Sequence, residues 1–174
     1  RAKAEGLAVT AEVTPHHLFF SNDSIPPEVD PRSTFFKFNP PIFSPEDQQA
    51  LRDALRDGTI DCVSTDHAPH ESELKAKGWR LAPFGTRGME TALPALLTLH
   101  KQGEISRDRL IEVFSEAPRR VLGRGEYKKP TGLLFVNPEA SYLVSENELP
   151  GISSNSCFIG SRLHGRIELR AEPG

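Results

Sequence analysis

The sequence predicts an α/β protein with a parallel sheet. Three segments support this fold class: an apolar stretch at 7–13, an amphipathic helix at 45–57 and a second apolar stretch at 59–64. A strand, a helix and a strand in this order form a βαβ unit, in which the two strands are parallel and the crossover is right-handed. Both a barrel and a doubly wound sheet are compatible with this order.

The first half of the chain has clear start and stop signals. Residues 1–6 have the composition of a helix tail, and 7–13 are apolar and β-branched enough for a strand. The helix at 45–57 begins after the N-cap Ser44, with Pro at its first position and acids in its first turn, and Gly58 ends it. Its apolar residues are spaced to form one buried stripe. They are Ala50, Leu51, Ala54 and Leu55.

The second half predicts two more helices and then a β-rich tail. A helix at 88–101 is expected to pack one apolar face on the sheet, and another begins at Arg107 after the N-cap Ser106. The expected packing face consists of Leu93, Leu96, Leu97 and His100. The strand candidates in the tail are 133–136, 140–144 and 166–169. We therefore expect a main unit at 1–122 and part of a small β-subdomain at 123–174.

Residues 65–70, Thr-Asp-His-Ala-Pro-His, place a carboxylate and two histidines at the end of the second predicted strand. Ligands of α/β and barrel enzymes bind at the carboxyl ends of the strands. The pattern therefore favours metal or proton-transfer chemistry centred on Asp66. The alternative is a turn in which the Asp66 side chain caps backbone amides.

Composition excludes several classes of partner. The net charge is −3 and no basic stripe is present, so nucleic acid is not expected. No apolar run approaches the ~20 residues that span a bilayer, and no signal sequence is visible, so we expect a cytoplasmic protein without membrane contact. Cys62 and Cys157 have no metal-ligand spacing and are expected to be reduced thiols.

Together with 37–41 (Lys-Phe-Asn-Pro-Pro) and 82–85 (Ala-Pro-Phe-Gly), the 65–70 segment resembles dihydroorotase of the long-chain bacterial type, in the amidohydrolase superfamily. The resemblance runs from about residue 9 to 94, and less specifically to 162–166. It implies the C-terminal portion of a (β/α)8 TIM-type metallo-dependent hydrolase barrel plus part of a small β-subdomain. A complete barrel needs ~250 residues, so we expect the chain to be part of a longer polypeptide. At 131–132 the chain has Thr-Gly where the family usually has Ala-Asp, which puts the local packing there in doubt.

The resemblance implies zinc-dependent hydrolysis of a cyclic amide, the reversible interconversion of N-carbamoyl-L-aspartate and dihydroorotate in pyrimidine biosynthesis. One or two Zn²⁺ ions would activate water, with Asp66 as both metal ligand and general acid/base. Asn39, His70, Phe84 and Gly85 match the substrate contacts. The loop at 67–87 is long enough to act as a lid.

Other histidines have structural roles in this interpretation. His67 is expected to hydrogen-bond beside the site rather than bind metal. His16 and His17, taken as neighbours in a strand, point to opposite faces and match no ligand of the family. Most zinc ligands are expected upstream of Arg1, so the isolated piece should be inactive.

The expected partners are the small-molecule substrate, the N-terminal half of the barrel, and a homo-oligomer or a complex with aspartate transcarbamoylase. Two other functions stay open: a catalytically inactive dihydroorotase-like scaffold subunit, and a hydantoinase or allantoinase.

Overall fold

The computed structural model describes residues 1–123, 133–149 and 151–171. Residues 131–132, where this sequence has Thr-Gly and the family usually has Ala-Asp, lie outside these ranges. The elements are β1 (Glu12–Val13), α1 (Pro15–Phe19), α2 (Pro45–Asp57), β2 (Cys62–Val63), α3 (Ser72–Lys75), α4 (Gly78–Leu81), α5 (Met89–Lys101), α6 (Arg107–Ile111), α7 (Ala117–Val121), β3 (Leu133–Leu143) and β4 (Arg162–Ala171). Short 3₁₀ segments lie at Asn22–Ser24, Pro31–Phe36 and Glu146–Glu148, and a π-helical segment at Glu112–Glu116 joins α6 to α7.

The predicted βαβ unit is confirmed. β1 and β2 are parallel, with Glu12 opposite Cys62 and Val13 opposite Val63, and α2 lies between them in the chain. Both strands are shorter than predicted, because the ladder extends over only two residues of each. Residues 1–6 form turns rather than the expected end of a helix.

Helix α2 has the predicted limits because both of its ends are capped locally. The Ser44 hydroxyl accepts the Asp47 amide at 3.2 Å, and the Asp47 carboxylate accepts the Ser44 amide at 3.2 Å. Gly58 follows in the left-handed conformation, with φ +87°, which costs glycine least. The predicted apolar stripe is only partly buried: Leu55 is in the core, but Ala50 is exposed and lines a pocket.

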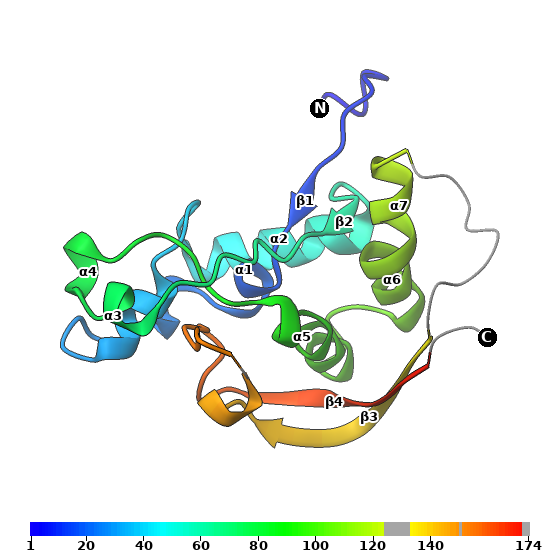
Figure 1. Ribbon diagram of the computed structural model, residues 1–174. Coiled ribbons are helices and arrows are strands. Elements are labelled where there is room, and N and C mark those ends of the chain that lie inside the picture. The colour runs from blue at the N-terminus through cyan, green and yellow to red at the C-terminus, as the bar shows by residue number, and fades with distance from the viewer. Residues whose placement is uncertain (124–132, 150, 172–174) are drawn as a thin grey trace.

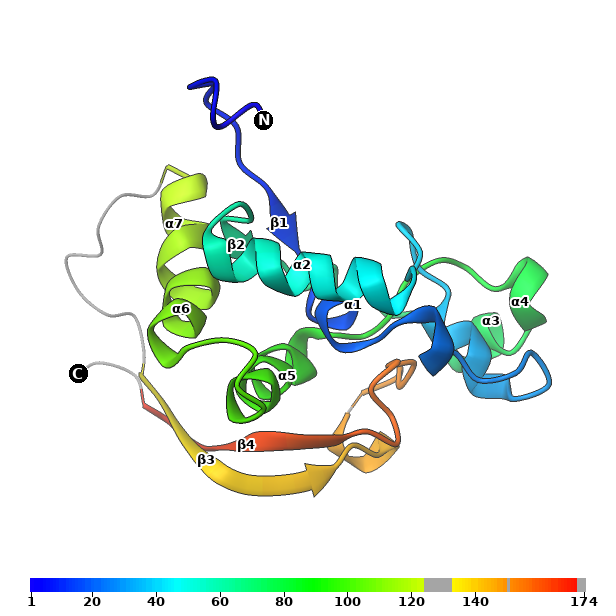
Figure 2. The same ribbon diagram turned by 180° about the vertical axis from the view of Figure 1, so that it is seen from behind.

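Helix α5 lies between the β1–β2 layer and the β3–β4 pair (Figures 1 and 2). One face packs Leu96 and Leu99 into a core shared with β1, β2, α1, α2 and α6. Ala95 faces a second core of aromatic and aliphatic side chains. Leu93, Leu96 and Leu97 thus pack on the first core as predicted, and α5 is covered on a second side as well.

The β-rich tail forms an antiparallel pair, β3 with β4, whose register shifts twice. It packs closely on α5: Gly165 has φ +88°, and a Cβ there would lie 2.3 Å from Cδ1 of Leu97. Phe158 and Leu163 join Phe20 and Phe36 in the second core, so the tail shares a core with the first half. The predicted division at residue 122 stays a prediction.

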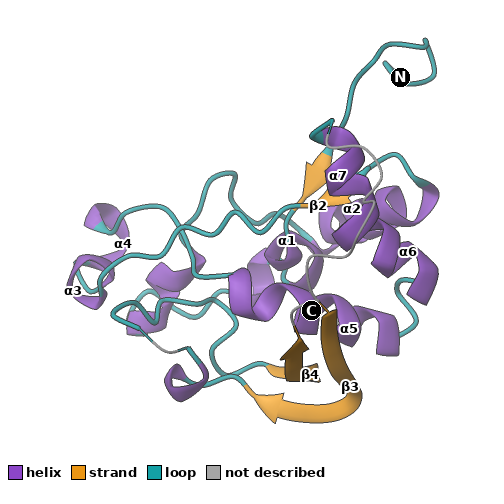
Figure 3. Cartoon of the chain, turned by 45° about the vertical axis from the view of Figure 1, so that its right-hand side comes forward, coloured by secondary structure: helices purple, strands orange, loops and turns teal. Residues whose placement is uncertain are grey.

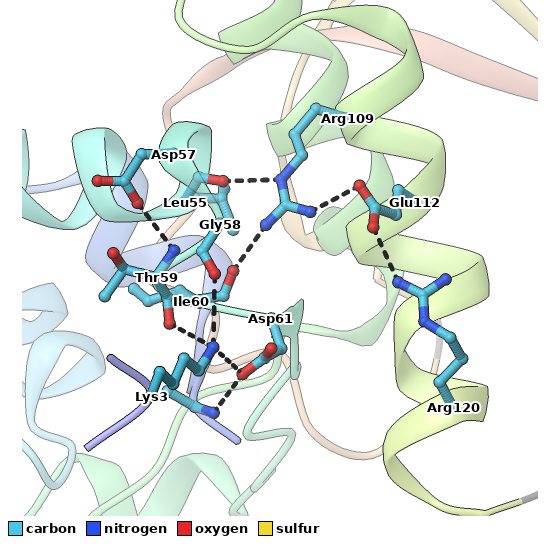
Figure 4. Close-up of polar contacts among 11 residues, drawn as sticks. Lys3, Leu55, Asp57, Gly58, Thr59, Ile60, Asp61, Arg109, Glu112 and Arg120 are labelled. Atoms are coloured by element: carbon cyan, nitrogen blue, oxygen red, sulfur yellow. Dashed lines mark hydrogen bonds and ion pairs between the residues drawn. The ribbon is translucent and has the colours of Figure 1, made fainter. Parts of the chain in front are cut away.

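A network of hydrogen bonds and ion pairs holds the amino end of β2 in place (Figure 4). Lys3 Nζ donates to Thr59 O and to the Asp61 carboxylate, each at 2.7 Å. The Arg109 guanidinium donates to Ile60 O at 2.7 Å and pairs with Glu112 at 2.6 Å. These contacts anchor the strand at the end opposite Asp66. Ligands of parallel α/β folds bind at the carboxyl ends of the strands, so contacts at the amino end serve stability.

No helix in the described ranges is both long and apolar enough to cross a membrane. Helices α3 and α4 lie in the loop at 67–87, which extends away from the helical layer (Figure 3). Both cysteines are free thiols, and both are buried. Burial raises the pKa of the Cys157 thiol to about 12, which makes this thiol unreactive at neutral pH.

Candidate functional site

Asp66 lies just beyond the carboxyl end of β2. The parallel pairing continues through Ser64, whose amide donates to Val13 O at 3.0 Å, and then the chain turns. Asp66 has φ +46° and is the one non-glycine residue with positive φ in the described ranges. A non-glycine side chain in this conformation costs of order 1 kcal/mol or more, and such residues concentrate at functional sites.

The Asp66 carboxylate is exposed and, among the described residues, has no hydrogen-bond or ionic partner. The alternative in which it caps a turn is therefore wrong. The carboxylate lines a pocket of about 540 Å³ at the carboxyl ends of β1 and β2. The pocket is lined by Glu12, Val13, Thr14, His17, Asn39, Pro40, Phe43, Asp47, Ala50, Leu51, Ser64 and Asp66. The structure thus brings two predicted site residues, Asp66 and Asn39, to one cavity.

His17 holds the segment that carries Asn39. It lies in helix α1, not in a strand as predicted, and its side chain is buried. Its Nε2 donates to Pro40 O at 3.1 Å, and its Nδ1 accepts from the Thr14 hydroxyl at 2.6 Å. Both ring nitrogens are used in these contacts, so this histidine positions the pocket wall.

His16 is buried in the same helix, and its ring lies 4.3 Å from Phe38 and 4.7 Å from His17 between centroids. Burial, together with the neighbouring His17, lowers its pKa to about 3. The imidazole is therefore neutral at physiological pH. It is a core residue, as the sequence interpretation expected for a structural histidine.

His70, Phe84 and Gly85 form a second group in the loop. His70 Nε2 donates to Phe84 O at 2.8 Å. A Cβ on Gly85, whose φ is +134°, would lie 2.6 Å from Ala68 O and 3.0 Å from His70 Nε2. Only glycine fits between these two stretches of chain. None of the three residues lines the pocket of Asp66.

The segment containing Lys37 and Asn39 connects the two groups. The Lys37 carbonyl accepts the Gly85 amide at 2.9 Å. Its ammonium donates to Ala82 O at 2.7 Å and lies 4.7 Å from the centroid of the exposed Phe84 ring. Asn39, two residues further on, reaches the pocket. The chain therefore runs directly from one group to the other.

His67 contacts backbone. Its Nδ1 accepts the Met89 amide at 3.1 Å and the Gly88 amide at 3.3 Å, so it satisfies donors at the start of α5 that lack a partner within the helix. This is the hydrogen-bonding role that the sequence interpretation favoured over a metal ligand.

Lys75 was missed by sequence reasoning. It is buried, and its ammonium donates to Pro83 O at 3.0 Å and to Gly85 O at 2.8 Å. Burial and, secondarily, the charge of Lys37 lower its pKa to about 8, so the group is largely protonated at neutral pH. A lysine in a polar loop gave no local signal of this burial.

The described residues do not by themselves make a zinc site. No group of three or more His, Cys, Asp and Glu side chains comes together among them, whereas zinc in proteins takes three or four protein ligands. Asp66 can offer one carboxylate. Any zinc bound here needs further ligands from outside the described chain.

No protein-family model matches the chain. Among curated proteins, it is 53% identical to the dihydroorotase of Bacillus cytotoxicus over 123 residues, which is 70% of this chain and 28% of that protein. A Bacillus cereus dihydroorotase is 52% identical over the same shares. The chain thus spans between a quarter and a third of the length of these relatives.

Solved structures give the same fold. An L-hydantoinase (dihydropyrimidinase) from Arthrobacter aurescens superimposes with a TM-score of 0.84 and 27% identity, over 98% of this chain and 39% of that one. An inactive dihydroorotase-like domain of a Chaetomium thermophilum multifunctional protein gives a TM-score of 0.67 and 24% identity, over 95% of this chain and 42% of that one. The predicted fold class, part of a metallo-dependent hydrolase barrel, is confirmed by these likenesses.

Proposed function

We propose that this chain, which is homologous to dihydroorotases over 70% of its length, supplies part of the active site of a zinc-dependent dihydroorotase. The reaction is the reversible interconversion of N-carbamoyl-L-aspartate and dihydroorotate in pyrimidine biosynthesis. The observation that carries the proposal is the unpartnered Asp66 carboxylate, held at the end of β2 and facing the same pocket as Asn39. The activity belongs to the polypeptide or assembly that completes the barrel, and we place it in the cytoplasm.

Asp66 is the proposed proton carrier. In ring opening, the oxygen of water bonds to the ring carbonyl carbon while the carboxylate takes a proton from that water. The carbon–nitrogen bond then breaks, and Asp66 returns the proton to the leaving nitrogen. An exposed carboxylate without a hydrogen-bond partner is free to do both. Zinc, when bound by ligands beyond this chain together with Asp66, would lower the pKa of the water.

Asn39, His70, Phe84 and Gly85 are the proposed substrate contacts. The Asn39 amide can donate and accept at once, which matches a cyclic ureide with adjacent N–H and C=O groups. His70 donates its Nε2 proton to Phe84 O, which leaves Nδ1 for the substrate. The absence of a side chain at Gly85 lets the ligand approach the backbone closely.

We also propose that the loop at 67–87 closes over the bound substrate. Several of its atoms are already fixed from within the fold, by Lys75, His70 and Lys37. Because Lys37 lies outside the loop and holds one side of it, closure is a movement of the outer part that contains α3 and α4, which would exclude water from the reacting centre. The homo-oligomer and the aspartate transcarbamoylase complex remain proposals for the whole protein.

One observation favours a second function, an inactive scaffold. The described residues bring together no three-ligand metal group, and the fold also matches the inactive dihydroorotase-like domain from Chaetomium thermophilum. The unpartnered carboxylate of Asp66 argues for the enzyme, because a scaffold has no need of a carboxylate in a left-handed conformation.

The test is turnover by the complete polypeptide that contains this chain, offered dihydroorotate, hydantoin and allantoin separately. The proposal predicts hydrolysis of dihydroorotate well above that of the other two rings. Preference for hydantoin or allantoin would indicate a hydantoinase or an allantoinase. The structural likeness to an L-hydantoinase agrees with the first of these. Hydrolysis of none of the three, with metal present, would favour the scaffold.

A further inference from the structure

Asn155 is a buried residue of the tail that reaches the loop at 67–87. It is 1% exposed and lies between Ser153 and Cys157, which are also buried. Its amide oxygen accepts the backbone amide of His70 at 2.8 Å, across 85 residues of sequence. Its amide nitrogen donates to Gly85 O at 3.3 Å. A single side chain therefore contacts both stretches of the loop that carry the proposed substrate contacts.

The backbone of Asn155 strengthens the same connection. Its carbonyl accepts the Arg87 amide at 2.9 Å and the Thr86 hydroxyl at 3.3 Å. Nearby, the Ser153 hydroxyl donates its proton to His70 O and also lies 3.1 Å from the Asn155 amide oxygen. The tail thus forms hydrogen bonds with the backbone N–H and C=O of His70 and with the chain at 85–87.

Lys75 completes the set of contacts from within the loop. Three successive carbonyls are each bonded by a side chain: Pro83 O by Lys75, Phe84 O by His70, and Gly85 O by both Lys75 and Asn155. Because all three carbonyls are engaged, the peptide planes at 83–85 have a fixed orientation. The direction of the His70 ring is then fixed as well, since its Nε2 bonds one of these carbonyls.

The burial of Asn155 explains why these contacts hold. A buried amide that loses a partner pays the desolvation cost of the group left unpaired. The Asn155 side chain is shielded from water, so the His70 amide has no alternative partner at that position, and Gly85 O would keep only the Lys75 ammonium. Asn155 therefore couples the stretch at 68–70 to the stretch at 83–87. If His70 moves away, Phe84 O loses the hydrogen bond from the His70 ring.

We propose that Asn155 is a positioning residue that holds His70 and the Phe84–Gly85 backbone in the geometry that binds substrate. The inference rests on the proposed function for its link to dihydroorotate, and on the hydrogen bonds alone for its structural part. It assigns a role in the substrate site to the tail of the chain, which touches no substrate itself.

The test uses the complete polypeptide that contains this chain, with two substitutions at one position. Asn155→Ala removes both contacts. Asn155→Asp keeps the oxygen that accepts the His70 amide and removes the donor to Gly85 O; the new carboxylate would lie beside the Lys75 ammonium, which bonds the same carbonyl. The matched control is Thr98→Val. Thr98 is also buried and also links two segments, since it donates to Pro94 O and accepts the His164 amide, but its bonds go to neither stretch of the loop.

Hydrogen exchange measured by mass spectrometry tests whether the Asn155 side chain holds the loop at His70. In Asn155→Ala, the peptide covering 68–70 should exchange about tenfold faster or more, because the His70 amide loses its acceptor. In Asn155→Asp, the same peptide should stay protected, because the carboxylate still offers an oxygen to the His70 amide. Thr98→Val should also leave it unchanged. Unchanged exchange of the 68–70 peptide in Asn155→Ala would overturn the proposal.

Steady-state kinetics with dihydroorotate tests whether Asn155 contributes to substrate binding. Asn155→Ala should raise KM about tenfold while kcat changes less than about threefold, because the residue positions binding groups and not the proton carrier. Thr98→Val should leave KM unchanged. An unaltered KM in Asn155→Ala would overturn the positioning role. If Asn155→Ala does not fold, Asn155→Asp decides through KM, which should rise because Gly85 O loses the donor from residue 155; an unaltered KM in that variant would overturn the positioning role. Absence of turnover by the unsubstituted polypeptide would instead refute the proposed function, and the exchange experiment would still decide whether Asn155 holds the loop.

Discussion

Replacing the buried His16 should remove much of the pH dependence of stability between pH 5.0 and 7.5. The imidazole is 1% exposed, and its Nε2 has no hydrogen-bond partner among the described residues. Burial first, and the adjacent His17 second, lower its pKa from 6.5 to about 3. Below about pH 6.5 the unfolded chain therefore binds a proton at this position that the folded chain does not bind until about pH 3.

The magnitude follows from proton linkage. Because the unfolded state binds more protons between about pH 3 and pH 6.5, the free energy of unfolding falls as the pH falls through that interval. At pH 5.0 the loss relative to pH 7.5 amounts to roughly 2 kcal/mol from this one group, and the limit well below pH 3 is roughly 5 kcal/mol. The first figure is a large part of the stability of an ordinary domain.

The assay is urea unfolding at pH 7.5 and pH 5.0 for the unsubstituted protein and for His16→Leu. The unsubstituted protein should lose about 2 kcal/mol more than the variant over this interval. The interval lies above the range in which carboxylates with lowered pKa, such as Asp61, take up protons. Equal losses in the two proteins would refute the reasoning, because His16 would then titrate alike in the folded and unfolded chains.

Three further predictions concern the loop and the core. His70→Ala should raise KM for dihydroorotate about tenfold and leave zinc content unchanged; loss of zinc, measured by atomic absorption, would mean that His70 is a ligand. Gly85→Ala should destabilise the protein by roughly 2 kcal/mol in urea unfolding, because its Cβ would lie 2.6 Å from Ala68 O; full stability would show that the loop can relax. Leu96→Ala, at a fully buried position, should cost about 3 kcal/mol of unfolding free energy; a cost under about 1 kcal/mol would place Leu96 outside the core.

Local signals predicted α2, α5 and the start of α6. Ser44 followed by proline, acids in the first turn and a closing Gly58 determine both ends of α2 through contacts within a few residues. The same signal is present at α1, where Thr14 accepts the His17 amide and Pro15 occupies the first helical position. The prediction of a strand at His16 and His17 is therefore wrong.

The site was predictable where chemistry and strand ends coincide. Asp66 stands out in sequence because it follows an apolar strand, and the structure places it at a pocket beside Asn39. Asn155 and Lys75 do not stand out. Their importance comes from contacts with His70 and with Pro83 and Gly85, and the link between Asn155 and His70 spans 85 residues. No periodicity or spacing in the sequence encodes a contact of that range.

The most direct test of the account is dihydroorotate hydrolysis by the complete polypeptide, compared with its Asp66→Asn variant. Asparagine keeps the size of the side chain and cannot carry the proton. We expect turnover by the unsubstituted protein and a fall in kcat of about a thousandfold in the variant, with an unchanged thermal midpoint. Turnover by Asp66→Asn close to that of the unsubstituted protein would contradict the assignment of Asp66 as the proton carrier.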